Sequence, residues 1–176
     1  MTIRKATLMD VAAVTAVFED THTLEEQGKT TIGWIRGVYP TRETAEAAVG
    51  RDDLFVLEEA GEILGCAIIN QLQVDVYEGA PWQHPAEEDR VMVLHTLVIS
   101  PRARAKGYGR QFVAYYEQYA RAHHCPFLRM DTNARNAQAR AMYKKLGYQE
   151  IAVVPCRFNG IEGVQLVLLE KYLGEA

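Results

Sequence analysis

Two spacings of apolar residues along the chain predict a succession of strands and helices. Apolar residues three or four positions apart, such as Val11, Val14 and Phe18, are typical of a helix with one buried face. Short runs of valine, leucine and isoleucine that end at glycine or proline indicate strands. Helices are expected at 11–27, 41–50, 110–121 and 136–146, and strands at 3–6, 54–58, 63–69, 91–99, 126–131, 148–154 and 163–170.

One polar stretch, 73–90, interrupts this pattern and is too long for a hairpin turn. It carries five acidic residues together with Tyr77, Trp82 and His84. Its aromatic residues would allow it to cover a ligand as a lid. Alternatively, it is an acidic excursion with Trp82 packed on the surface, and the sequence leaves both interpretations open.

A basic loop with two glycines joins the strand at 91–99 to the following helix. Pro101 ends the strand because it cannot donate a ladder hydrogen bond. Gly107 and Gly109 let backbone N–H groups turn toward an anion, and the helix start adds its own unpaired N–H groups. Mobile positive charge surrounds the same point, from Arg102, Arg104, Lys106 and Arg110. The pattern predicts a phosphate or pyrophosphate site.

Two common phosphate-binding motifs do not fit this loop. The chain has no Gly-x-x-x-x-Gly-Lys-Ser/Thr run, and Phe112 stands where a dinucleotide fingerprint requires its third glycine. What remains is Arg104-x-x-Gly107-x-Gly109, which resembles the pyrophosphate loop of the GCN5-related N-acetyltransferases. A glycine-containing turn before an ordinary helix is the alternative. The resemblance implies acetyl-CoA as co-substrate, bound by Leu97, Val98, Ile99, Arg104, Ala105, Lys106, Gly107, Tyr108, Gly109 and Arg110.

A second stretch, 136–148, is similar to another signature of the same family, Asn-x-x-Ala-x-x-x-Tyr-x-x-x-Gly-Phe/Tyr. Asn136 is also a suitable helix N-cap, and Gly147 suits the position after the helix end. Asn136, either Ala139 or Arg140, and Tyr143 fall on one helix face. The span of about 10 Å between Asn136 and Tyr143 suits contacts along the pantetheine arm. The family fold is α/β (α+β), a mixed central sheet of six to seven strands flanked by about four helices, and the resemblance covers essentially the whole chain.

Composition narrows the remaining classes of function. Hydrophobic residues make up 48% of the chain and charged residues 24%, which suits a single globular domain, 1–176. A net charge of −4 without a basic stripe gives no support to nucleic-acid binding. Three scattered cysteines lack metal-ligand spacing, and no apolar run is long enough for a membrane span. We expect a cytoplasmic protein without a metal site.

The resemblance implies direct transfer of the acetyl group to an amine in a ternary complex. Tyr143 is expected to protonate the departing thiolate, and a core tyrosine at a helix end is the alternative. His95, in the middle of a strand and expected to share a face with Val93 and Leu97 unless a bulge intervenes, is the candidate base. A buried histidine satisfied by its neighbours is the alternative there. Asp131, Glu78 and Glu87 are the other candidate bases.

The acceptor is expected to be a small amine, contacted by Trp34, Tyr39, Trp82 and Asp131. In the family, the region of Trp34 and Tyr39 forms one wall of the acceptor pocket, although aromatic residues between helices are as often plain packing. A protein lysine or N-terminus, a non-catalytic acyl-CoA sensor and a nucleotide-binding module are the alternatives. The sequence leaves monomer and homodimer open.

Overall fold

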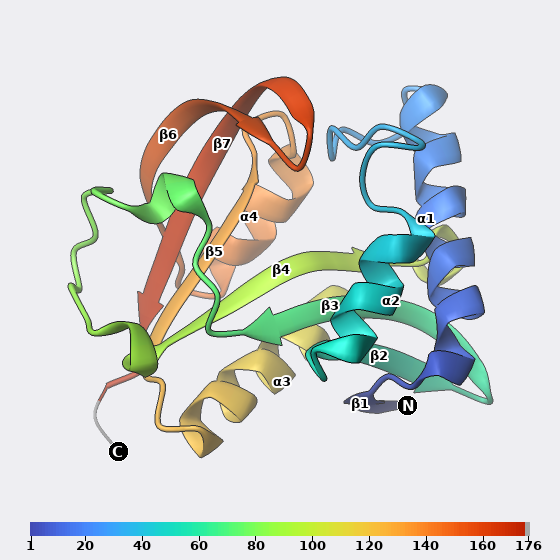
Figure 1. Ribbon diagram of the computed structural model, residues 1–176, viewed down its shortest axis with the longest axis horizontal. Coiled ribbons are helices and arrows are strands. Elements are labelled where there is room, and N and C mark those ends of the chain that lie inside the picture. The colour runs from blue at the N-terminus through green and yellow to red at the C-terminus, as the bar shows by residue number, and fades with distance from the viewer. Residues whose placement is uncertain (175–176) are drawn as a thin grey trace.

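A seven-stranded mixed sheet forms the centre of the computed structural model, which describes residues 1–174 (Figure 1). The strands lie in the order β1-β2-β3-β4-β5-β7-β6, and β4 and β5 are parallel whereas the other neighbours are antiparallel. The strands are β1 (Thr2–Lys5), β2 (Leu54–Glu59), β3 (Glu62–Asn70), β4 (Val91–Ile99), β5 (Phe127–Asn133), β6 (Gln149–Phe158) and β7 (Ile161–Tyr172).

Four α-helices cover the two faces of this sheet. Helices α1 (Val11–Glu26) and α2 (Arg42–Gly50) lie on one face, where their apolar side chains bury Leu54, Val56 and Ile68. Helices α3 (Tyr108–Ala122) and α4 (Ala137–Lys145) pack on the other face (Figure 1). Element order and fold class agree with the expectation from sequence, and β6 extends four residues beyond its expected end at 154.

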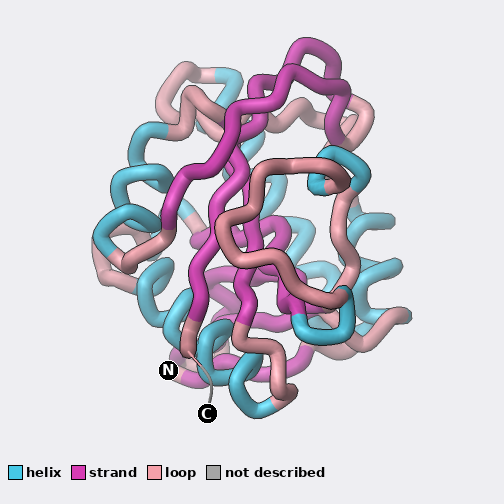
Figure 2. Tube along the Cα trace, turned by 90° about the vertical axis from the view of Figure 1, so that its left-hand side faces the viewer, coloured by secondary structure: helices cyan, strands magenta, loops and turns pink. Residues whose placement is uncertain are grey.

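The polar segment 73–90 lies across the sheet on the side of α1 and α2, over β5 and β7 (Figure 2). Tyr77 is almost fully buried there, against Val93 and Leu168. The buried carboxylate of Glu170 on β7 accepts hydrogen bonds from the backbone N–H groups of Gln83 at 2.6 Å and His84 at 3.3 Å. The segment is therefore anchored on the sheet at Tyr77 and at Glu170. No helix within residues 1–174 combines the length and apolar character needed to cross a membrane.

The parallel pairing of β4 and β5 is short, and α3 supports it from below. The two strands pair only between Val91–Leu94 and Phe127–Met130. The hydroxyl of Tyr116, buried under both strands, donates to the carbonyl of Met92 at 2.6 Å and lies 3.2 Å from that of Arg129. One phenol thus bridges the two strands immediately before they separate.

Removing this hydroxyl with Tyr116→Phe should lower the free energy of unfolding by about 1–2 kcal/mol, because the two buried carbonyl groups lose the O–H donor that they share. Urea unfolding followed by circular dichroism measures the change. The control is Tyr119→Phe on the same helix, which removes a partly exposed hydroxyl and should change stability by less than about 0.5 kcal/mol. Equal losses in the two variants would contradict the bridging role.

Candidate active site

The site forms where β4 and β5 separate. Beyond Leu94 and Met130, β4 continues beside β3 alone and β5 beside β7 alone. A bulge accompanies the separation: the β3–β4 register shifts, and Thr96 adopts a φ of 53°. Leu94 and Leu97 consequently pack in the same cluster on the α3 side, although three positions separate them. Leu97 therefore does not share the face of Val93, because the bulge that the sequence left open inserts an extra residue.

A cleft of about 650 Å³ lies on the side of α3 and α4. Gly107, with a φ of 79°, is the N-cap of α3 and directs the loop into the first helical turn. Gly109 faces α4 so closely that an added Cβ would approach the sulfur of Met142 to 3.2 Å. The predicted cofactor residues that line the cleft are Leu97, Val98, Ile99, Arg104, Ala105, Gly107, Tyr108, Gly109, Arg110, Asn136 and Tyr143.

Two predicted cofactor residues do not line this cleft. The guanidinium of Arg140 donates to Glu150 at 2.7 and 2.8 Å and to the carbonyl of Ala134 at 2.8 Å. Lys106 places its ammonium group 5.8 Å from the centre of the Tyr108 ring. Of the two alternatives on that helix face, Ala139 lines the cleft, whereas the guanidinium of Arg140 is paired with Glu150. The lining residues that sequence reasoning missed include Thr30, Ile32, Gln138, Met142 and Lys145, and the last three lie within the second signature.

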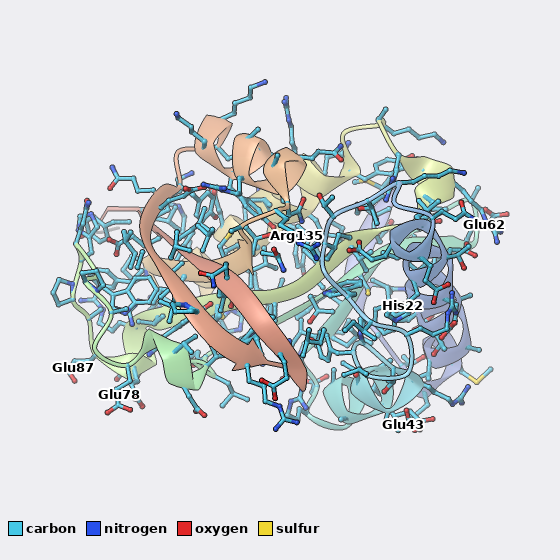
Figure 3. The ribbon with its side chains drawn as sticks, turned by 90° about the horizontal axis from the view of Figure 1, so that it is seen from above. His22, Glu43, Glu62, Glu78, Glu87 and Arg135 are labelled. Carbon is cyan, nitrogen blue, oxygen red and sulfur yellow. The ribbon has the colours of Figure 1, made fainter. Side chains whose placement is uncertain are left out.

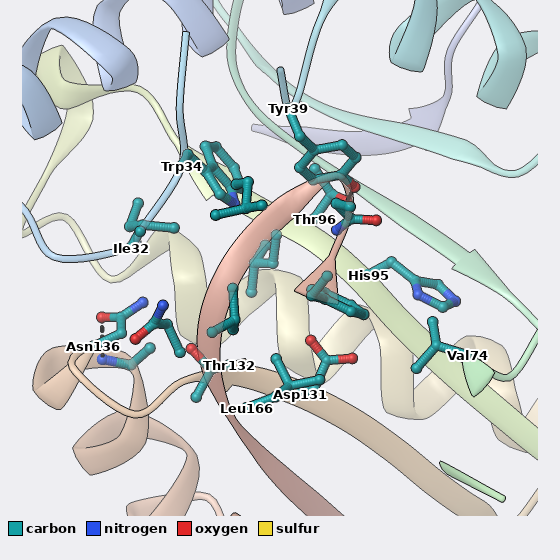
Figure 4. A pocket seen from close by; sticks show the side chains of 18 of the residues that line it. Ile32, Trp34, Tyr39, Val74, His95, Thr96, Asp131, Thr132, Asn136 and Leu166 are labelled. Atoms are coloured by element: carbon teal, nitrogen blue, oxygen red, sulfur yellow. Dashed lines mark hydrogen bonds between the residues drawn. The ribbon is translucent and has the colours of Figure 1, made fainter. Parts of the chain in front are cut away.

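A smaller chamber of about 140 Å³ lies on the other side of the β4–β5 gap (Figure 4). The predicted residues Trp34, Tyr39, His95, Asp131 and Tyr143 all line it. Sequence reasoning missed the contribution of the β6–β7 hairpin, and no pattern there distinguished it from an ordinary turn. The missed lining residues with the clearest bearing on ligand contact are Thr96, Asn133, Phe158 and Asn159.

Trp82, predicted to contact the acceptor, does not line the chamber. Its indole N–H donates to the carbonyl of Tyr77 at 3.0 Å, and its ring packs edge-on against the Tyr77 ring at 5.2 Å. The guanidinium of Arg129 lies over the indole at 4.2 Å. Trp82 therefore packs the 73–90 segment onto the sheet, which corrects the prediction. The segment still forms part of the chamber wall, through Val74.

Tyr143 lines both the cleft and the chamber, together with Ile32, Leu97, Asn136 and Ala139. The helix that carries it begins at Asn136, whose side chain accepts a hydrogen bond from the backbone N–H of Ala139 at 3.2 Å. Burial, assisted by the nearby Asp131 carboxylate, raises the pKa of the Tyr143 phenol above its ordinary value of 10. The phenol is therefore protonated at neutral pH and is available as a donor at the junction of the two cavities.

Two further polar groups in the chamber have pKa values changed by burial. Burial lowers the pKa of His95 to about 4, so the ring is neutral at pH 7. Its Nε2 lies 2.9 Å from Oδ1 of Asn70, and the ring turns toward Val74 (Figure 4). Burial raises the pKa of Asp131 to about 6, although the hydroxyl of Tyr77 donates to its Oδ2 at 2.7 Å.

The segment between α1 and α2 provides the aromatic wall of the chamber. The hydroxyls of Tyr39 and Thr96 are hydrogen-bonded to each other, which joins this segment to the bulge in β4. Trp34 meets the Tyr39 ring edge-on at 6.3 Å. Within residues 1–174, no group of three or more histidine, cysteine or acidic side chains is arranged to hold a metal ion.

The chain is similar in sequence and in fold to known acetyltransferases. The acetyltransferase (GNAT) family model matches residues 18–148. The chain is 27% identical over 150 residues to YhfO, an uncharacterized N-acetyltransferase of Bacillus subtilis, covering 85% of this chain and 91% of that protein. A GNAT-family acetyltransferase of Streptococcus agalactiae has a TM-score of 0.81 at 22% identity, over 99% of this chain and 96% of that one.

A structure of YncA from Salmonella typhimurium, described as an acetyltransferase with its cofactor acetyl-CoA, has a TM-score of 0.71 at 20% identity. The match covers 100% of this chain and 95% of that chain. At these identities the two structural comparisons show a common fold, and the family model extends over the loop at 104–109 and the helix that carries Tyr143.

The raised pKa of Asp131 should make the folded protein more stable as the pH falls. Its folded-state pKa of about 6 exceeds the unfolded value of about 3.9, so the folded protein binds the extra proton and gains stability as pH falls through this window. Asp131→Asn should remove that gain. When the pH is lowered from 8 to 4, the free energy of unfolding of the wild type should therefore rise relative to that of Asp131→Asn, on the order of 2 kcal/mol.

Urea unfolding of both proteins across this pH range measures the shift. Tyr77→Phe is the matched variant, because it removes the hydroxyl that donates to Asp131 and keeps the carboxylate. It should retain the pH dependence of the wild type or strengthen it. A constant difference between wild type and Asp131→Asn would show that the pKa of Asp131 is not raised.

Proposed function

The chain belongs to the acetyltransferase (GNAT) family and is an acetyl-CoA-dependent N-acetyltransferase, and from this premise we propose that it acetylates a primary amine of a small molecule. The observation that carries the proposal is the meeting of two cavities at Tyr143, in the gap between β4 and β5. The larger cavity suits the co-substrate and the smaller one suits the acceptor. The acetyl group would pass between them in a ternary complex, without an acetylated enzyme.

On the co-substrate side, we assign the pyrophosphate to the loop at 104–110. Backbone N–H groups at the start of α3 and the side chains of Arg104 and Arg110 provide positive charge there. Beyond Leu94 the edge of β4 has no strand beside it on the β5 side. The pantetheine arm can pair with this edge at Leu97–Ile99 as an added strand would, which brings the thioester toward Tyr143.

The acceptor must reach the thioester as a neutral amine. Neutralising an alkylamine at pH 7 costs roughly 4–5 kcal/mol for a pKa of about 10.4. Its nitrogen then attacks the carbonyl carbon, the C–N bond forms, the C–S bond breaks, and one N–H proton leaves. A backbone N–H of β4 near Leu97 could hold the oxyanion during this step.

Tyr143 is the proposed donor to the departing thiolate of CoA. Its raised pKa makes proton transfer to sulfur uphill, because the thiolate of a thiol with a pKa of about 8.5 is a weaker base than this phenolate. The proton therefore moves late, as the C–S bond breaks. Its position in the lining of both cavities supports this role.

The proton of the amine has two candidate acceptors in the chamber, His95 and Asp131. The low pKa of His95 makes it a weak base at pH 7, and its Nε2 is already engaged by Asn70. Asp131, with a pKa of about 6, is better matched to the task. His95 as the base stays a prediction, which His95→Ala tests: loss of activity similar to that of Asp131→Asn would support it.

Tyr143→Phe should lower kcat by about 10²-fold or more, because the thiolate loses its proton donor. The affinity for acetyl-CoA should stay within about twofold, since the ring is retained. CoA release against a panel of polyamines, amino acids, aminoglycosides and lysine peptides measures kcat, and calorimetry measures the affinity. Tyr115→Phe on α3 is the control and should leave both unchanged. A variant at position 143 with wild-type kcat would refute the proton-donor role.

The basic loop should determine co-substrate affinity. Arg104→Ala and Arg110→Ala should each weaken acetyl-CoA binding about tenfold at low salt, and less at high salt because the attraction is screened. Arg42→Ala, which removes an exposed arginine of α2, is the charge-matched control and should have no effect. Comparable affinity for ADP and for CoA would instead favour the nucleotide-binding alternative, and binding without any turnover would favour the acyl-CoA sensor.

A further inference from the structure

We infer that Asp131 recognises the ammonium group of the acceptor, and that the acceptor therefore presents an unbranched aminoalkyl arm with no carboxylate on the carbon that bears the amine. This inference rests on the proposed function, whose substrate class it narrows. It is carried by the position of one carboxylate in a small chamber that contains no group of opposite charge.

The chamber has an unbalanced set of charges. Asp131 is its one acidic lining residue, and none of its lining residues is a lysine or an arginine. The other polar lining groups are neutral hydroxyls, side-chain amides and the uncharged imidazole of His95. A cationic acceptor finds a partner there, whereas the carboxylate of an α-amino acid would be buried beside a like charge without a counterion. The chamber thus favours amines and disfavours zwitterionic α-amines.

The carboxylate of Asp131 is held in a defined orientation. Asp131 follows Met130, the last β5 residue paired with β4, so it lies where the two strands separate. Its Oδ2 accepts the hydrogen bond from Tyr77, which is almost fully buried and cannot move aside without disturbing the core. The carboxylate projects from β5 into the chamber (Figure 4). One oxygen is engaged by the protein, and the other is available to a ligand.

The carboxylate of Asp131 has the negative charge that recognition of an ammonium group requires at pH 7. With its pKa raised to about 6 by burial, Asp131 is mostly ionised at pH 7. An ammonium group that replaces the water around the carboxylate gains a charge-assisted hydrogen bond in a poorly solvated chamber. The same carboxylate is close enough to Tyr143 to raise the pKa of its phenol, so an amine bound to Asp131 lies near the proposed thioester position.

The volume of the chamber and the polarity of its lining limit the size and chemistry of the alkyl part of the acceptor. A cavity of about 150 Å³ holds a benzene-sized ligand, so this chamber of about 140 Å³ accommodates roughly six non-hydrogen atoms. Apolar and aromatic side chains provide about half of its surface and suit the methylene groups of an alkyl arm. The apolar and aromatic lining residues include Trp34, Tyr39, Val74, Leu94, Phe158 and Leu166.

The arm has a route to the outside. A groove of about 500 Å³ between the 29–39 segment and the β6–β7 hairpin shares Gly33, Trp34 and Asn133 with the chamber. Arg135 lines this groove and lies above the gap between the two segments (Figure 3). The part of the acceptor beyond the arm would emerge here, whether it is the remainder of a free polyamine or the backbone that carries a lysine side chain.

Two amines that differ only in one carboxylate test the inference. Pentylamine and norleucine have the same carbon chain and amine, and norleucine adds a carboxylate on the amine-bearing carbon. Calorimetry with the CoA-saturated protein should show binding of pentylamine and at least about tenfold weaker binding of norleucine. Asp131→Asn should weaken pentylamine binding about tenfold or more and leave CoA affinity unchanged, which also shows that the variant is folded.

Other binding results would contradict either the role of Asp131 or the proposed function. Equal binding of norleucine, retained pentylamine binding by Asp131→Asn, or no pentylamine binding by a wild type that binds CoA would overturn the role of Asp131 alone. Failure of the wild type to bind CoA would overturn the proposed function and this inference with it. Asp75→Asn, which removes a different acid of the 73–90 segment, is the matched control and should bind pentylamine as the wild type does.

Turnover then distinguishes the two sources of the arm. The ratio of kcat/KM for cadaverine to that for a peptide with a blocked N-terminus and one lysine shows whether a free diamine or a protein side chain is preferred. Free lysine provides an internal check, because it has both kinds of amine. Mass spectrometry should find acetylation at its ε-amine, and acetylation at its α-amine would contradict the inference.

Discussion

The short parallel pairing between β4 and β5 is the constraint on which the site depends. Parallel strands that stay paired along their whole length leave no room for a ligand between them. Here the ladder ends after Leu94 and Met130, and the bulge at Thr96 turns the remainder of β4 away. The separation exposes one edge of β4, opens a cavity on each side of the sheet, and brings Tyr143 to the point where the cavities meet.

The two cavities have opposite electrostatic character. The cleft for the co-substrate has backbone N–H groups, two arginines and Lys145, whereas the chamber has a single carboxylate. A phosphorylated ligand is therefore attracted to one side and a cationic ligand to the other. The separation of charge reduces the chance that either ligand occupies the wrong cavity, and the neutral phenol of Tyr143 forms the boundary.

The sequence predicted the elements, their order and most of the residues that line the larger cleft, because those features depend on local patterns. Apolar spacing, the two glycines and the N-cap at Asn136 act over a few residues. The errors arose where contacts with residues outside the local sequence pattern determine the position of a side chain. Arg140 pairs with Glu150, Trp82 packs under Arg129, and Thr96 adopts a conformation that β-branched residues rarely take. Nothing adjacent in the sequence indicates any of the three. The raised pKa of Asp131 likewise follows from burial by segments that fold over it.

The hydrogen bond between Tyr77 and Asp131 joins residues 54 positions apart and connects the 73–90 segment to the smaller chamber, which Asp131 lines. Most of the 73–90 segment lies outside both cavities, so its outer residues can vary without contact with the co-substrate. Changes that shift Tyr77 would nevertheless reorient the carboxylate beneath it. Acceptor preference could thus diverge between relatives through substitutions in this segment, while the acetyl-CoA machinery remains unaltered. In protein engineering, substitutions in the 73–90 segment could change acceptor selectivity without changing the residues proposed to act in catalysis.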